Sequence, residues 1–188
     1  LEGASVVQSR NAGFGAMRIV SSGTFGAGRL QFRANVGEGS GLGLDGGGSV
    51  NVTAGSLDVS FSGKVPFGFL TRQLAAQGLS LSGGADVTIT ARGPFGAPQL
   101  GGSVRTSGAR FIHAPSGIAV NDLAADVGLA SGTATINSLR GALSTGGTIN
   151  GSGTVRIDGG SGFPADLRVN IVDGRYTDGQ IVTASFDG

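Results

Sequence analysis

Histidine-based acid–base or metal chemistry in this chain would depend on His113, because it is the only histidine, and thiolate chemistry is excluded because cysteine is absent. Two-histidine and thiolate metal sites therefore cannot form. A Ser–His–Asp triad would need a nucleophile elbow, and the sequence contains no Gly-x-Ser-x-Gly. Phe111 and His113 are two residues apart, which is strand spacing. We interpret His113 as an ordinary histidine near the end of a strand, and we predict no catalytic site, metal or cofactor.

Glycine spacing gives two further motifs, and neither predicts a site. Gly41, Gly43 and Gly46 match Gly-x-Gly-x-x-Gly, but a dinucleotide site needs a helix after the glycines, and here a strand pattern follows. Residues 40–45 are similar to one calcium β-roll repeat, but a single copy cannot stack ligand turns. Seven glycines fall among the twelve residues 37–48. We predict a Gly-rich loop or joint there.

The composition favours a folded β protein without a nucleic-acid partner. The chain has 188 residues, 38 of them glycine, with 39% hydrophobic and 13% charged residues. The net charge is +1, which gives no field that would attract a nucleic-acid backbone. No apolar run reaches the length of about eighteen residues that a membrane helix needs. We predict one elongated domain over residues 1–188, and we expect it to be a piece of a longer protein because it begins within a strand-like pattern.

Alternation of apolar and polar residues is the main structural signal. It is unbroken over residues 57–62, 85–92 and 163–171, and weaker over residues 50–52, 123–129 and 155–157. In each strong segment all the charges lie on one side, which is typical of antiparallel strands wetted on one face. Gly83-Gly84, Gly101-Gly102 and Gly146-Gly147 are expected to form turns between strands. The fold class is therefore all-β, a mostly antiparallel sheet built from many short strands.

Residues 69–77 (FLTRQLAAQ) are the exception to the strand pattern. They are good helix formers with Leu70 and Leu74 four apart, and Gly78 follows as a stop signal. We predict one short helix there, packed against an end of the sheet.

Alternating strands must bury their apolar sides, and two architectures satisfy this equally. One is a sandwich of two sheets, and the other is a single curled, U-shaped sheet with an apolar inner face. In both, the apolar residues of the predicted strands form one continuous surface. Its members are Val59, Phe61, Val87, Ile89, Val104, Phe111, Val127, Leu129, Val155, Ile157, Leu167, Val169 and Ile171.

Residues 93–105 (GPFGAPQLGGSVR) resemble the recurring unit of TamB-like proteins, in which a strand ends at Gly-Pro and Gly-x-apolar-x opens the next strand. Residues 65–70 (VPFGFL) and 78–83 (GLSLSG) are similar to the helical interruption of that family. Downstream, the similarity continues through residues 108–111, 117–123, 163–169 and 176–179. It covers about residues 55–188, and the N-terminal third is similar only in composition.

The resemblance implies a fold and a role. TamB-like proteins are anchored in the inner membrane of Gram-negative bacteria and cross the periplasm as a long, curled β-sheet, the β-taco, with an apolar groove. They engage TamA, an Omp85 protein of the outer membrane, in the translocation and assembly module, and they are linked to lipid transport, protein secretion and outer-membrane biogenesis. Accordingly, the thirteen apolar residues named above would line a groove for phospholipid acyl chains. Contact with TamA would use parts of the protein outside this chain.

Two other expectations accompany this reading. The main alternative is a structural or adhesive extracellular β-stalk, like an autotransporter passenger, with a regular solenoid and a closed, dry interior. The C-terminal residues 181–188 have strand composition and are expected to leave an open sheet edge, through which the chain would self-associate.

Overall fold

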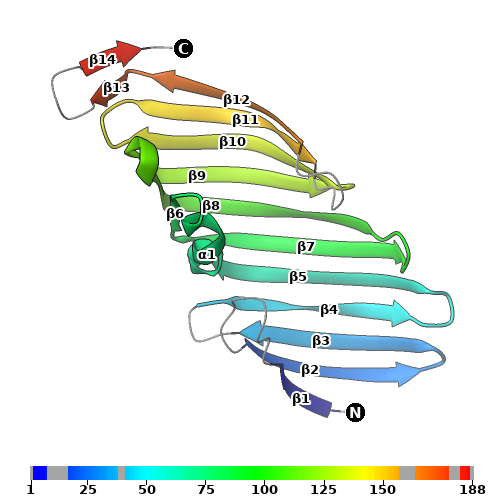
Figure 1. Cartoon of the computed structure of the whole chain (residues 1–188). Coiled ribbons are helices and arrows are strands. Elements are labelled where there is room, and N and C mark those ends of the chain that lie inside the picture. Colours follow the sequence, from blue (N-terminus) through cyan, green and yellow to red (C-terminus); the bar gives the residue numbers. More distant parts are fainter. Residues whose placement is uncertain (1, 8–16, 38–40, 157–163, 178–182, 187–188) are drawn as a thin grey trace.

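The computed structural model describes residues 2–7, 17–37, 41–156, 164–177 and 183–186. These residues form a large antiparallel sheet, in which sequential strands lie side by side and the two edges do not meet (Figure 1). The fold is all-β, as the alternation predicted, and the sheet is open and curled, as the resemblance implied. Its strands are β1 Glu2–Val7, β2 Met17–Gly26, β3 Arg29–Gly37, β4 Gly43–Asn51, β5 Ser56–Pro66, β6 Leu79–Ser82, β7 Gly84–Pro94, β8 Gln99–His113, β9 Ile118–Ala130, β10 Thr133–Leu143, β11 Thr148–Arg156 and β12 Ala165–Val172.

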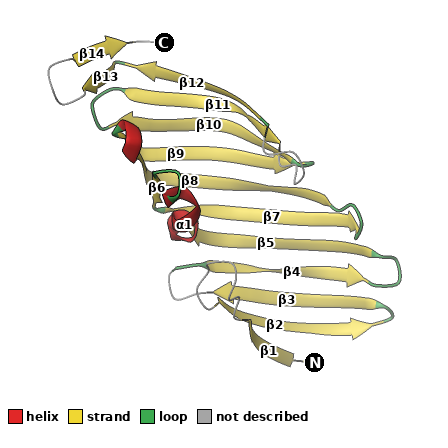
Figure 2. Ribbon diagram, in the orientation of Figure 1, coloured by secondary structure: helices red, strands yellow, loops and turns green. Residues whose placement is uncertain are grey.

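The order of pairing follows the chain from β1 to β12, with one interruption. β5 pairs with β7, and the short strand β6 pairs with β8 beside the start of β7. The N-terminal strands belong to the same sheet as the rest. The described residues contain no second sheet stacked on this one; β13 (Gly174–Thr177) and β14 (Thr183–Phe186) pair only with each other (Figure 2). Of the two architectures left open by the sequence, the structure therefore has the single layer.

The helical segment lies in the connection between β5 and β7. A 3-10 turn, η1 (Phe67–Leu70), leads into the helix α1 (Thr71–Ala75), and Gly78 follows at a φ of 71°. The helix predicted over residues 69–77 is thus present, in a shorter form. A second 3-10 turn, η2 (Ala114–Ser116), joins β8 to β9. No helix within the described ranges is long and apolar enough to cross a membrane.

Two glycine expectations were wrong. Residues 43–48 belong to strand β4, so the loop predicted over 37–48 is confined to the short connection before Gly43, of which residues 38–40 lie outside the described part. Gly101 and Gly102 lie within β8 and form no turn. The physical reason is close contact between strands: a Cβ on Gly46 or Gly102 would overlap the backbone of the neighbouring strand. Composition alone does not separate such a glycine from one in a loop.

The C-terminal edge also differs from the expectation. Part of the segment 181–188 is a strand, β14, but it pairs with β13 instead of extending the main sheet. Asp173, at a φ of 54°, separates β12 from β13. Among the described strands, β12 therefore forms the C-terminal edge of the main sheet, and each of its residues except Ile171 is exposed.

Very little of this sheet is fully buried. Among the described residues, the only buried hydrophobic ones are Ala85, Ala109, Ala119 and Val120, and no large side chain is fully buried. The chain exposes 11920 Å² of surface. A compact folded monomer of this mass would expose about 8,200 Å². A single layer explains the excess, because its apolar side chains contact one another but have no second layer against them.

Candidate functional site: an uncovered apolar face

The strand register collects the apolar side chains on one face of the sheet. Residues paired directly across antiparallel strands point to the same side. Two rows of such partners each cross ten strands, from β2 to β12, and we call the side that carries them the apolar face. Row 1 consists of Ile19, Val36, Leu44, Gly63, Val87, Val104, Val127, Ile136, Gly153 and Leu167.

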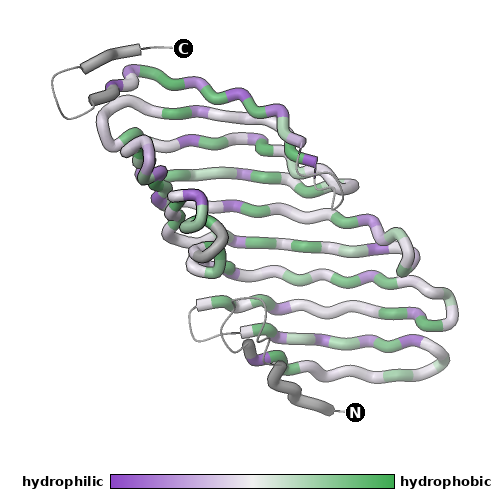
Figure 3. The backbone as a smooth tube through the Cα atoms, in the orientation of Figure 1, coloured by the Kyte–Doolittle hydropathy of each residue, from purple (hydrophilic) through white to green (hydrophobic). Residues whose placement is uncertain are grey.

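Row 2 lies beside row 1. It consists of Ser21, Ala34, Gly46, Phe61, Ile89, Gly102, Leu129, Ala134, Val155 and Ala165. Apart from Ser21, every member is apolar or glycine. At a strand spacing of about 4.8 Å, each row runs for about 43 Å across the sheet. Apolar and polar residues alternate along the individual strands (Figure 3).

The structure brings together the predicted apolar residues that it describes. Val87, Val104, Val127 and Leu167 lie in row 1, and Phe61, Ile89, Leu129 and Val155 lie in row 2. Val59, Val169 and Ile171 share the face at neighbouring alternate positions of β5 and β12. Ile157 lies outside the described residues. That these residues line a lipid groove stays a prediction.

Phe111 reaches the same face by way of two bulges. β8 has one extra residue between Thr106 and Ala109, and β9 has one extra residue between Val120 and Leu123. Each bulge shifts the alternation by one residue. As a result Phe111 lies opposite Val120 of β9 and Leu81 of β6, and the apolar face continues past the bulges.

Sequence reasoning missed several members of the apolar face. In the N-terminal third, Leu30, Phe32, Ala34 and Val36 alternate with exposed Gln31, Arg33 and Asn35, a signal that was available in the sequence. Leu44, Leu100 and Ile136 were missed for a different reason. Gly46 and Gly102 interrupt the alternation after Leu44 and Leu100, and a register shift interrupts it after Ile136, so the period-two pattern is hidden.

The opposite face is polar and carries a ladder of alternating charge. Lys64, Asp86, Arg105 and Asp126 are partners across β5, β7, β8 and β9. Nζ of Lys64 lies 2.9 Å from Oδ1 of Asp86, and Nε of Arg105 lies 2.6 Å from Oδ2 of Asp126. A third pair joins Arg92 to Asp58 at 2.9 Å. These pairs are solvent-exposed, and each contributes little to stability. Their charged side chains all lie on the polar face, so the apolar rows carry no charge.

Asp126 is the most strongly constrained carboxylate of this ladder. It accepts hydrogen bonds from Nε of Arg105 and, at 2.8 Å, from Nδ2 of Asn137. These two hydrogen bonds favour the charged form and hold the pKa of Asp126 below its ordinary value of 3.8.

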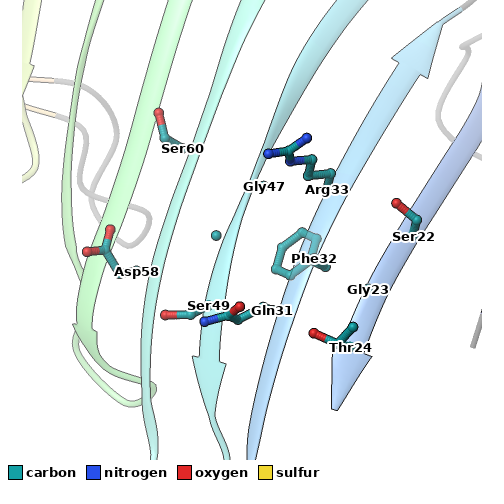
Figure 4. A pocket seen from close by; sticks show the side chains of 11 residues that line it. Ser22, Gly23, Thr24, Gln31, Phe32, Arg33, Gly47, Ser49, Asp58 and Ser60 are labelled. Atoms are coloured by element: carbon teal, nitrogen blue, oxygen red, sulfur yellow. The ribbon is translucent and has the colours of Figure 1, made fainter. Parts of the chain in front are cut away.

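The polar face also has a broad hollow over β2 to β5, with a volume of about 820 Å³. Polar side chains including Ser22, Arg33, Asp58 and Ser60 surround it, and Gly47 leaves its floor without a side chain (Figure 4). Asp58 already pairs with Arg92. The side chains that line this hollow do not point toward one common position, as those of an acid–base or metal-binding site would have to.

His113 has a local structural role. Its Nδ1 lies 2.7 Å from Oγ of Ser116, which ties the end of β8 to the turn η2. Among the residues that the structure describes, no three His, Asp or Glu side chains gather as metal ligands would. Gly43 and Gly46 of the Gly-x-Gly-x-x-Gly motif lie within β4, and β5 follows in place of a helix.

Comparisons with known proteins add no identification. No family model, curated protein or solved structure matches the chain. The extended, uncovered apolar face is therefore the feature from which a function has to be argued.

Proposed function

We propose that this chain is a periplasmic segment of a TamB-like bridge between the inner and outer membranes, and that its apolar face shields or conducts phospholipid acyl chains. In this role it supports outer-membrane biogenesis and protein insertion without catalysing a reaction. The partner would be a TamA-like Omp85 protein, contacted by other parts of the bridge. The observation that carries the proposal is the pair of apolar rows on a single, uncovered layer.

The dimensions and chemistry of the rows support an acyl-chain ligand. A lipid monolayer contributes about 15 Å of hydrocarbon to a bilayer, so rows of about 43 Å would hold more than one acyl chain end to end. The backbone groups inside the sheet are paired between strands, and the rows carry one hydroxyl and no charge. A ligand that lies on them gains apolar burial but no hydrogen bonds, which matches hydrocarbon.

The β-stalk alternative has less support. It requires a closed, dry interior, whereas the described strands form one open layer with exposed apolar residues. Ile89 is 45% exposed and Val169 is 58% exposed on the apolar face.

Substitutions at two adjacent residues of β7 test the proposal. Ile89 lies on the apolar face and Thr90 on the polar face. Ile89→Asp should weaken binding of the fluorescent fatty acid cis-parinaric acid at least about tenfold, because a carboxylate beside the ligand would lose hydration without a partner. Thr90→Asp is the matched control and should change binding less than about twofold. Equal binding by both variants, or no binding by the unmodified chain, would contradict the proposal. Circular dichroism checks that both variants stay folded.

A further inference from the structure

The connection between β5 and β7 lies over a small part of the apolar face, at the end of β5 and the start of β7, and we call its residues 67–75 the cap. The N–H of Phe67 donates to the carbonyl of Gly83 at 2.9 Å, which closes the base of this connection. The N–H of Ala114 donates to the carbonyl of Gly78, also at 2.9 Å, and ties the segment that follows the cap to the turn after β8. The cap is therefore anchored on both sides, and it packs against β6 and the start of β7 (Figure 1).

An apolar cavity of about 380 Å³ lies between the cap and the sheet. Phe67, Phe69 and Leu70 of the cap line one side. Val65, Ala85, Val87 and Val104 of the sheet line the other, and Val87 and Val104 are members of row 1. Val127, the next member of row 1, does not line the cavity. Leu44 of row 1 also lines the cavity, so the cavity lies over row 1 from Leu44 to Val104, and the row continues beyond it on both sides.

The lining of the cavity selects its ligand. Every side chain that lines it is apolar. A headgroup or peptide backbone inside it would lose hydrogen bonds to water without replacement, whereas an alkyl chain would lose none. Dry apolar cavities of about 150 Å³ bind benzene, so this cavity is large enough for several methylene groups. The charged ladder that includes Lys64 and Arg105 lies on the opposite face of the sheet, so none of its side chains lines the cavity.

We propose that the cavity under the cap is a binding site for the methyl end of a single acyl chain. The remainder of that chain would lie on row 1, beyond Val104, with its polar end outside the cavity. This inference rests on the proposed lipid function and adds to it a defined site and a defined orientation of the ligand.

The absence of tryptophan from the chain allows a direct test by fluorescence quenching. Phe67→Trp would place the only tryptophan in the cavity, and Leu129→Trp would place it on row 2 outside the cavity. The probes are two forms of hexadecanoic acid, one brominated at its last carbon and one brominated beside the carboxyl group. Phe67→Trp should be quenched more strongly by the first probe, with saturation at one equivalent. Leu129→Trp should show no such preference.

A second pair of variants checks that the cavity itself is the site. Val104→Phe fills it and, in the Phe67→Trp background, should raise the probe concentration needed for quenching about tenfold, the effect of removing roughly two methylene groups from apolar contact. Ser103→Phe adds the same ring at the adjacent position of β8, on the polar face and outside the cavity, and should leave quenching intact. Equal effects of the two variants would overturn the proposal.

The outcomes also separate this inference from the proposed function. If both brominated acids quench both tryptophans equally, the face binds lipid but the cavity is no chain-end site, and the inference is wrong while the proposed function stands. If the unmodified chain binds no fatty acid, both are wrong. Preferential quenching of Phe67→Trp by the terminally brominated acid, lost in Val104→Phe, supports the inference.

Discussion

Gly101 and Gly102 are neighbours in β8, but only one of them requires glycine. Gly102 has a φ of 146°, a conformation that L side chains rarely adopt, and a Cβ there would overlap the carbonyl oxygen of Thr88. A Cβ on Gly101 would lie 3.1 Å from the hydroxyl of Thr90, which can rotate away. The same mid-strand geometry recurs at Gly48, Gly63 and Gly153. At the residue scale, these glycines thus allow the backbone of one strand to approach the neighbouring strand where a side chain would not fit.

We expect Gly102→Ala to lower the free energy of unfolding by about 3 kcal/mol, from backbone strain and overlap. Gly101→Ala, the control, should change it by less than about 1 kcal/mol. Urea denaturation followed by circular dichroism measures both. Similar losses in the two variants would show that the backbone at Gly102 is not special.

Asp126 gives a pH dependence whose direction follows from its hydrogen bonds. Its pKa is lower in the folded chain than in the unfolded chain, so its stabilising effect is present above the unfolded value and is lost as the pH falls through the folded value. Asp126→Asn cannot titrate. The melting temperature of the unmodified chain should exceed that of the variant at neutral pH, and the difference should shrink below about pH 4. A difference that stays constant down to about pH 2 would rule out this role for Asp126.

Strand β4 shows how a Gly-rich element is stabilised by its neighbours. Gly46 lies opposite Phe61 of β5, and Gly48 lies opposite Phe32 of β3. The two rings lie on the apolar face with centroids 6.5 Å apart, so they contact across the strand that separates them. Aromatic side chains that cover glycines in this way compensate for the missing packing of the glycine strand.

The contact between the two rings can be measured by a double-mutant cycle. Phe61→Leu and Phe32→Leu should each destabilise the chain by about 1–2 kcal/mol, and the double variant should lose about 0.5–1 kcal/mol less than the sum. Ser60→Ala, on the polar face of β5, is the control and should be near neutral. Strict additivity of the two leucine variants would mean that the rings do not interact.

At the scale of the whole molecule, the described strands have an uncovered apolar face and open edges at β1 and β12. Both favour association in the absence of lipid, but through different surfaces. Val169 and Asn170 are adjacent in β12 and point to opposite faces. Substitutions at these two positions can therefore distinguish edge pairing from face-to-face packing.

We expect the chain to associate mainly through its edge. A lysine on an edge strand opposes strand pairing from either face, so Val169→Lys and Asn170→Lys should each weaken association in sedimentation equilibrium by about tenfold. If only Val169→Lys has an effect, the copies associate through the apolar face. A detergent that covers the apolar face should then have the same effect as that substitution.

The sequence by itself determined the all-β class, the short helix and the sharing of one face by residues such as Val87, Ile89 and Leu167, because alternation is a local property of each strand. It did not determine the role of glycines such as Gly46 and Gly102, because the same residue serves loops and close strand contacts. Only the tertiary structure decided that the sheet is a single layer and that the cap and the sheet form an apolar cavity between them. Those features depend on which strands pair and on what lies above the sheet, and the period of two is the same for a sandwich and for an open face.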